Sequence, residues 1–408
     1  MFFKKKRVAY SSGSLSGLAW KKFLNNKPGL FSLYFVIFVT VVAILGYWLT
    51  PDSTPYSNRQ ILEISMQKPL FSVEMLKVRI NKPEEKVSVF KSMLFGKPDN
   101  YRLVPVESWH DVKDKIVVKL YDKDGLGDTE SFNLADVVYP VEKILKSDDG
   151  SITFRDVSGA TRTVSLHELK KKIETDHFVK KYYLLGTVQF GRDLLSRLII
   201  GTRVSLSVGF ISVVISLVVG LFLGSVAGYF RGRADDLIMW LINVVWSIPT
   251  LLLVIAITFA LGRGFWQIFV AVGLTMWVEV ARVVRGQIIS LREKEFVEAG
   301  YALGFSHLRI ITRHILPNAL SPVIVISAAN FAAAILIEAG LSFLGIGVQP
   351  PLPSWGGMIK EYYGFIILDS AYLAIVPGLA IVLLVLAFMT MGNSLRDALD
   401  VKEVTNER

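Results

Sequence analysis

The stretch SLREKEFVEAGYALGFSHLRIITRHILPN occupies residues 290–318, between two long apolar runs at 266–281 and 319–346. Unlike those runs it is polar and charged, and its apolar residues recur at helical spacing in two short groups. Gly304 separates the groups, and glycine enters a left-handed turn more cheaply than any other residue. The sequence therefore predicts two short helices joined by a tight turn, forming a water-exposed docking element between membrane spans.

Local signals predict where these two helices begin and end. Ser290 and Ser306 carry hydroxyl groups that accept hydrogen bonds from the free N–H groups of a first helical turn, so each is expected to cap one helix. Pro317 has no N–H group and is expected to end the second helix.

The composition is that of a polytopic membrane protein. The 408 residues are 52% hydrophobic, with a mean hydropathy of +0.46. Runs of about 20 apolar residues, long enough to cross a bilayer, repeat along the chain. Much of the net charge of +10 lies beside these runs, where cytoplasmic Lys and Arg orient the spans. We therefore expect membrane lipid, and no nucleic acid, as a partner. The absence of cysteine excludes disulfides and thiolate chemistry.

Six spans are predicted, with both termini in the cytoplasm. The basic cluster from Lys4 to Arg7 and further lysines precede the first span, whereas no such cluster follows it. The expected segments are a cytoplasmic start at 1–29, spans near 30–50, 203–229, 238–261, 266–281, 319–347 and 372–392, and a cytoplasmic tail at 396–408.

Residues 51–185 differ from the rest of the chain because they are charged and contain only short apolar runs. We expect an inserted extracytoplasmic α+β domain there. Predicted strands are 71–80, 114–121, 131–138 and 151–157, and a predicted helix is 166–178. The acidic run around Asp122–Asp128 lacks EF-hand spacing, so a hairpin tip is expected and no metal site.

Two residues inside the predicted spans are candidates for a transport pathway. Pro249 lies within the third span, where proline is tolerated if a neighbouring helix or water meets the freed carbonyl group. Glu338 lies in the fifth span, and a carboxylate at that depth is expected to face protein or water. A pathway role and a structural partnership with another span remain equal alternatives for Glu338.

The docking element carries a specific motif. Glu298-Ala299-Gly300, three residues, Gly304, nine residues and then His314-Ile315-Leu316-Pro317 resemble the EAA loop of bacterial ABC importer permeases. The form from His314 to Asn318 resembles the peptide and nickel branch. An ordinary cytoplasmic helical hairpin is the alternative. The resemblance assigns ATPase coupling to Glu298, Ala299, Gly300, Gly304, His314, Leu316 and Pro317.

A second segment carries the same resemblance. GTVQFGRDLLSR at residues 186–197 resembles the GTDxxGRDxxSR segment of these permeases, with Val188 in place of the first Asp. The resemblance predicts a short interfacial helix near the pathway mouth, with Gly191, Arg192 and Asp193 as mouth candidates. The alternative, held as equally good, is that Arg192 and Asp193 only form an ion pair or cap a helix.

Together the two motifs resemble the C-type permease subunit of oligopeptide/dipeptide/nickel ABC importers, over about residues 18–50 and 186–400. The resemblance implies a type I importer permease fold, all-α, with a five-helix core at 186–395 in the bacterial inner membrane. It implies a second, B-type permease, two ATP-binding subunits and an extracytoplasmic substrate-binding protein. The chain has no GxxxxGK[ST] phosphate loop, so no cofactor and no catalytic residue are expected.

Two other classes of protein fit the sequence less well. A membrane hydrolase would need a nucleophile with its base or a metal cluster, but the five histidines are scattered. A proton-coupled secondary transporter would use Glu338 and Glu279, yet it has no need of a docking hairpin.

Overall fold

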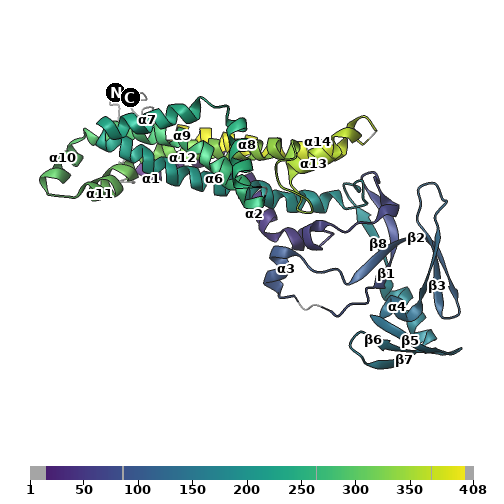
Figure 1. The fold of residues 1–408 in the computed structure, drawn as a ribbon. Helices are drawn as coiled ribbons and strands as arrows, with labels where there is room; N and C mark the ends of the chain where they lie inside the picture. Colours follow the sequence, from purple (N-terminus) through teal and green to yellow (C-terminus); the bar gives the residue numbers. More distant parts are fainter. Residues whose placement is uncertain (1–14, 85–86, 263, 369, 400–408) are drawn as a thin grey trace, which may run out of the picture. The chain divides into compact units, whose positions relative to one another are not determined.

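The computed structural model describes residues 15–84, 87–262, 264–368 and 370–399 (Figure 1). Its internal packing divides the chain into two compact units, one over 1–40, 205–348 and 378–408, the other over 41–204 and 349–377. The Lys4–Arg7 cluster and residues 400–408 of the predicted tail lie outside the described residues.

Helices account for most of the chain outside residues 51–193. They are α1 (Leu15–Asn25), α2 (Lys27–Leu49), α6 (Leu194–Phe230), α7 (Gly232–Trp246), α8 (Thr250–Leu261), α9 (Phe265–Arg292), α10 (Glu295–Ala302), α11 (His307–Arg309), a π-helical segment (Ile310–Ile315), α12 (Leu316–Phe343), α13 (Trp355–Tyr362) and α14 (Tyr372–Leu399). Five helical runs among the described residues are long and apolar enough to cross a membrane, namely α2, α6, α9, His307–Phe343 and α14. The prediction of a polytopic helical membrane protein is thereby confirmed.

The predicted third span is not one continuous helix. α7 and α8 pass the same test for a span only as a pair, and they are bent by 96° at the break between them. Pro249 lies at this break, as the residue that precedes α8. Proline removes a backbone donor and disfavours helical geometry in the residue before it, so the helix stops instead of absorbing Pro249 as a kink.

A stripe of three glycines brings α6 into backbone contact with α9. A Cβ atom built on Gly224 would lie 2.5 Å from the carbonyl oxygen of Ala281, and one on Gly228 would lie 2.8 Å from that of Arg285. A Cβ atom on Gly220 would meet Val280 at 2.6 Å. Small residues allow this approach, which in lipid replaces the hydrophobic drive that packs helices in water.

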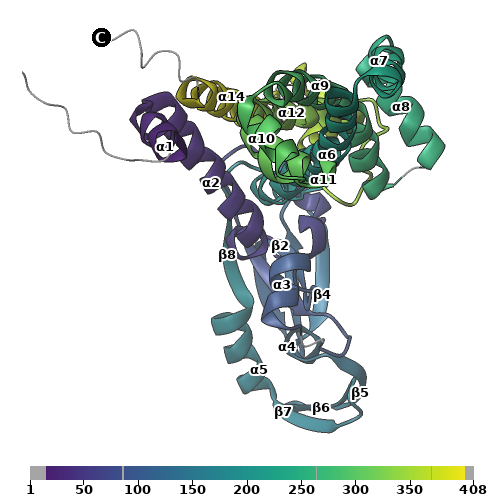
Figure 2. The same cartoon turned by 90° about the vertical axis from the view of Figure 1, so that its left-hand side faces the viewer.

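Residues 71–183 contain two antiparallel sheets (Figure 2). The five-stranded sheet has the order β4-β3-β2-β1-β8, and the three-stranded sheet has the order β5-β6-β7. The strands are β1 (Phe71–Arg79), β2 (Tyr101–Val112), β3 (Lys115–Leu120), β4 (Thr129–Asn133), β5 (Val141–Ser147), β6 (Ser151–Asp156), β7 (Thr161–Ser165) and β8 (Phe178–Tyr183). One buried core joins both sheets to α4 (Leu134–Val138) and α5 (Leu166–Lys172), and it includes Ile116, Phe154 and Leu169.

Two of the elements predicted for this segment are wrong in part. The strand predicted at 131–138 ends at Asn133, whose side chain accepts a hydrogen bond from the N–H of Ala135 and starts α4. The helix predicted at 166–178 is α-helical only to Lys172 and continues as a π-helix to His177. In α4 four of the five residues are buried, and a short helix buries neighbouring apolar residues that a strand would point to opposite faces.

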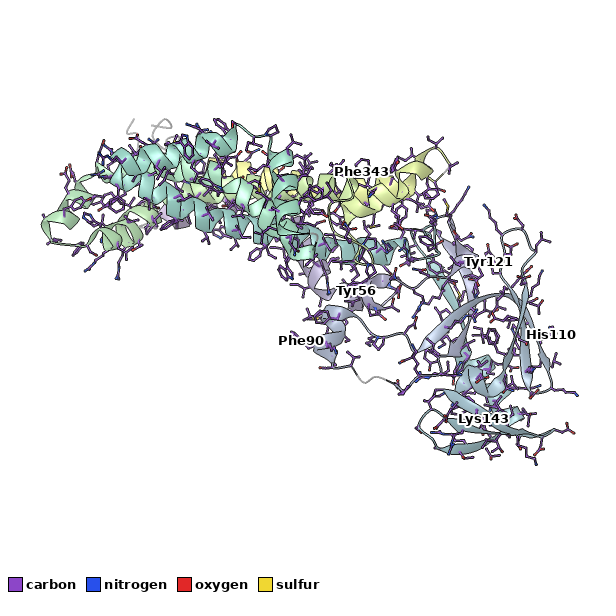
Figure 3. The ribbon with its side chains drawn as sticks, viewed as in Figure 1. Tyr56, Phe90, His110, Tyr121, Lys143 and Phe343 are labelled. Atoms are coloured by element: carbon purple, nitrogen blue, oxygen red, sulfur yellow. The ribbon has the colours of Figure 1, made fainter. Side chains whose placement is uncertain are left out.

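A short helix, α3 (Val89–Phe95), is held by the side chain of Arg203. The guanidinium of Arg203 donates to the carbonyl oxygens of Met93 and Leu94, each at 2.7 Å. It also donates to the carbonyl oxygens of Ala43 at 2.5 Å and Ile44 at 2.8 Å, near the end of α2. Phe90 lies on α3 (Figure 3), and its side chain is 67% exposed.

The glycine stripe yields a direct test. We expect Gly224→Ala to destabilise the folded protein by about 1 to 3 kcal/mol, because the new methyl group meets the backbone of α9 and forces the helices apart. The midpoint of thermal unfolding of the detergent-purified protein measures the effect.

The matched control is Gly286→Ala on α9, where a Cβ atom meets nothing within 4 Å. Here we expect no loss, and a gain of up to about 1 kcal/mol from the higher helix propensity of alanine. Equal midpoints for the two variants would contradict the packing described for α6 and α9.

Candidate functional site

The segment 290–318 forms a helical hairpin, as the sequence predicts, but its ends differ from the prediction. α10 and α11 lie together at one end of the compact unit formed by residues 1–40, 205–348 and 378–408, which we call the helical unit (Figure 1). Gly304 has φ +74° in the turn between them, and the Ser306 side chain accepts a hydrogen bond from the N–H of Arg309 at 3.4 Å. These two features follow from the residue types that the sequence offers at the turn.

Ser290 and Pro317 do not mark helix ends. Ser290 lies inside α9, which continues to Arg292, and Lys294 precedes α10 without a side-chain cap. Pro317 lies in the first turn of α12, directly after the π-helical segment, so the helical run continues through it. A first helical turn tolerates proline because its N–H groups have no helical partner.

An apolar cluster fixes the hairpin to the long helices beneath it. Val297 of α10 and Ile310 and Ile315 of the π-helical segment are fully buried against Val284 and Ile288 of α9. The hairpin is therefore continuous with the packed core of α9 and is not a loose loop.

A chain of hydrogen bonds adds a polar attachment to the end of α6. The Tyr301 hydroxyl donates to the Tyr229 hydroxyl at 2.7 Å, and the Tyr229 hydroxyl lies 2.8 Å from Nδ1 of His307. Arg292 donates to the carbonyl oxygen of Tyr229 at 2.6 Å. Sequence reasoning missed Tyr229, because its partners lie 72 and 78 residues away and no local pattern links them.

The seven residues predicted for ATPase coupling all lie on this hairpin or at the start of α12. Exposed members are Glu298, Ala299, Gly304 and Pro317, half-buried members are His314 and Leu316, and Gly300 is buried. The His314 ring stacks on Phe305 with ring centres 5.5 Å apart. The hairpin thus presents a surface of polar, small and exposed apolar residues, the last including Leu303 and Leu308, above a buried apolar base.

Within the segment 186–197, residues 186–193 form a turn and residues 194–197 are the first turn of α6, so the separate short helix predicted there does not form. Gly191 has φ +66° and lies so close to Ile61 that a Cβ atom would overlap its carbonyl oxygen. Helix α6 begins only at Leu194, and the Asp193 carboxylate caps it by accepting from the N–H of Ser196 at 2.9 Å. Burial raises the pKa of Asp193, although both hydrogen bonds from Ser196 oppose this shift.

Arg192 shares a carboxylate with Arg197. Both guanidinium groups contact Glu361 of α13, and the side chains of Arg192 and Arg197 are 7% and 6% exposed. These contacts match the pairing and capping alternative for Arg192 and Asp193. Glu361 was not foreseen, because it lies 164 and 169 residues from its partners in the sequence.

The two remaining pathway candidates fall in different surroundings. Glu338 is fully buried on α12, and its Oε1 accepts a hydrogen bond from Ser342 at 2.6 Å. Pro249 belongs to the break between α7 and α8, which borders a cavity of about 190 Å³. Glu338 does not line this cavity; its polar lining includes Thr275, Glu279 and Asn330.

Comparison with known proteins places these features in one family. Residues 220–403 match the model of the binding-protein-dependent transport system inner membrane component, and residues 14–69 match the N-terminal TM domain of oligopeptide transport permease C. The chain is 40% identical over 218 residues to the glutathione transport system permease protein GsiD of Pectobacterium atrosepticum, an alignment that covers 53% of this chain and 72% of that protein. The chain belongs to the family of binding-protein-dependent transport system inner membrane components. The resemblance drawn from the hairpin motif is confirmed at this level.

A second curated relative agrees with this assignment. The permease is 43% identical over 221 residues to the di/tripeptide transport system permease protein DppC of Pseudomonas aeruginosa, covering 54% of this chain and 72% of that one. A solved structure of the MetNI methionine ABC transporter in an inward-facing conformation matches 50% of this chain and 97% of its own, with 19% identity and a TM-score of 0.43. The two family models include the hairpin and the cavity, whereas residues 70–219 fall between the matched ranges.

The shared carboxylate of Glu361 gives a testable prediction for this permease. Glu361→Gln leaves two buried guanidinium groups without their shared counter-charge, so we expect a loss of up to about 3 kcal/mol in folding stability. Thermal unfolding of the purified protein at constant ionic strength measures it.

Glu84→Gln is the control, since that carboxylate is 63% exposed and pairs with Arg79 at 3.6 Å. It should change stability by less than about 1 kcal/mol. A Glu361→Gln protein as stable as this control would show that the buried arginines do not depend on the carboxylate.

Proposed function

We propose that this permease is the C-type subunit of an ATP-driven importer of peptides. The observation that carries the proposal is its identity of 40% over 218 residues and 43% over 221 residues to proteins named as glutathione and di/tripeptide permeases. The proposed assembly contains a second, B-type permease, two ATP-binding subunits and an extracytoplasmic substrate-binding protein. The permease itself carries out no covalent chemistry and transmits motion from the ATPase subunits to a shared pathway.

The hairpin supplies the proposed docking site for an ATPase subunit. Its outer surface offers Glu298 and Ala299, while Val297 and Ile310 attach its inner face to α9. The hydrogen bonds of Tyr229 attach the same hairpin to α6. Because packed cores are stiff and resist continuous deformation, a displacement of the hairpin is carried into these helices as a rigid movement.

The movement reaches the cavity through two helices. α9 enters the hairpin at its amino-terminal end and carries Thr275 and Glu279. α12 leaves the hairpin at its carboxy-terminal end and carries Asn330. All three residues line the cavity. In the proposed mechanism, ATP binding and hydrolysis change the separation of α9 and α12 from the partner permease and so open the pathway to alternate sides.

The proton-coupled alternative gains no specific support. Glu338 accepts a hydrogen bond from Ser342 and does not line the cavity. Membership of a binding-protein-dependent family also favours an external binding protein over a proton gradient.

The turn of the hairpin provides a test of coupling. We expect Gly304→Val to destabilise the native conformation of this turn by roughly 1 to 3 kcal/mol. A β-branched residue is strained at φ +74°, although the space around it is open. Peptide import by proteoliposomes and co-purification of the ATPase subunit should both fall at least severalfold, while the protein still inserts into the membrane.

Gly300→Ala is the matched control in the same hairpin. Gly300 lacks a positive φ, and an added Cβ atom meets its nearest neighbours at 3.6 Å, an ordinary contact. Because the added methyl group faces the buried side chain of Ile310 and the half-buried side chain of Phe305 and leaves the exposed surface and the turn unchanged, import should stay near the wild-type rate. Wild-type import and co-purification in Gly304→Val would remove the role proposed for this turn.

The proposed orientation places both termini and the hairpin in the cytoplasm, and residues 51–185 outside. The chain has no cysteine, so single-cysteine variants report topology cleanly. Thr129→Cys and Ser306→Cys both change exposed residues. A membrane-impermeant maleimide should label the first in intact cells and the second only after permeabilisation. The reverse labelling pattern would overturn this orientation.

A further inference from the structure

The cavity between α8, α9 and α12 has the features of a ligand site that no motif marks. Its wall includes Trp246 and Ile248 at the break after α7, Thr275 and Glu279 of α9, and Asn330 and Ile337 of α12. Its volume of about 190 Å³ compares with about 30 Å³ for a water molecule in the liquid, so it holds several waters or one end of a small peptide.

Asn330 is the first observation that points to a ligand. Its side chain is 2% exposed, it lines the cavity, and its Nδ2 has no hydrogen-bond partner among the described residues. Leaving a buried amide donor unpaired costs about 1 to 3 kcal/mol, so such donors are normally completed by water or a ligand. A peptide carbonyl oxygen supplies the acceptor that this donor lacks.

Glu279 is the second observation. It lies on α9 one helical turn after Thr275, so both point to the same side of the helix, and no ion pair joins it to a cation among the described residues. The guanidinium of Arg282, three residues away, stacks on the Trp246 ring at 3.9 Å instead. Glu279 is exposed within this chain, and a carboxylate without a cation partner at a cavity in a membrane-spanning helix favours a site that receives cations.

We propose that this cavity binds the amino-terminal end of a peptide during transport, with Glu279 accepting from the α-ammonium group and Asn330 donating to the first peptide carbonyl oxygen. The inference rests on the proposed function and adds to it a binding site for the amino-terminal end of the peptide and the two residues that contact it. The apolar wall from Ile248 and Ile337 leaves the side chain of the peptide without polar contacts. Such a wall suits a pathway that transports peptides of many different sequences, because the two polar contacts involve only groups common to all peptides.

Cysteine protection tests this inference without relying on transport. In the full complex, prepared without the binding protein, Ile337→Cys places a single thiol in the cavity wall. We expect the dipeptide alanyl-alanine to slow its modification by a small methanethiosulfonate reagent. The N-acetylated dipeptide has no ammonium group and should protect at least roughly tenfold less well. Ser306→Cys on the hairpin should show no protection by either compound.

Second-site changes assign the contacts. Adding Glu279→Gln to the Ile337→Cys protein should raise the half-protecting dipeptide concentration roughly tenfold, which corresponds to the loss of one charge-assisted contact. Adding Asn330→Leu should raise the half-protecting concentration of both compounds by a similar factor, since both carry the carbonyl group. Asp236→Asn removes an exposed carboxylate of α7 outside the cavity and should leave protection unchanged.

The outcomes separate this inference from the proposed function. If the wild-type complex imports peptides but neither compound protects Ile337→Cys, the cavity is not a peptide site. Equal protection by the two compounds would overturn the ammonium contact. The same outcome would follow if the dipeptide protected Ile337→Cys equally well with and without the added Glu279→Gln change. If the wild-type complex imports no peptide, the proposed function fails, while ammonium-dependent protection would still support the site.

Discussion

The backbone contact between α6 and α9 is the constraint on which the helical unit depends. Lipid supplies no hydrophobic drive between helices, so close approach must come from residues without bulk, and Gly220, Gly224 and Gly228 supply it. The same contact brings the end of α6 beside the hairpin, where Tyr229 meets its two partners. The hairpin and the glycine stripe are therefore parts of one packed body.

Local residue chemistry was enough to predict the centre of the hairpin but not its ends. The turn at Gly304 and the cap at Ser306 each depend on a single residue and its immediate neighbours. Where α9 stops and whether Pro317 ends a helix depend on tertiary packing and on the π-helical segment, which no short pattern reveals. Tyr229, Glu361 and Asn330 escaped prediction for a related reason, because their surroundings are assembled from distant parts of the sequence.

The segment between α2 and α6 shows how well the alternation of residue types predicts strands. The strands near 71–80, 114–121 and 151–157 were predicted within a residue or two, because β-formers and turn residues alternate there. Leu134–Val138 contains the same residue types, yet it forms a helix, because the Asn133 cap and burial on several sides outweigh β-propensity. The span predicted around Pro249 is bent by 96° between α7 and α8, a feature that hydropathy does not detect because it reports only the length and apolarity of a segment.

The hydrogen bonds of Arg203 have a consequence for how this protein can be recombined with its relatives. One guanidinium serves carbonyl groups from both α2 and α3, although it belongs to α6, which follows the entire segment between α2 and α6 in the chain. A lysine has only three donors on one atom and cannot reproduce this planar arrangement. The segment between α2 and α6 is therefore not self-contained, because a residue of α6 completes its hydrogen bonds. A chimaera that transfers it to another permease must carry the matching arginine in the recipient helix, and sequence boundaries alone would place the junction on the wrong side of it.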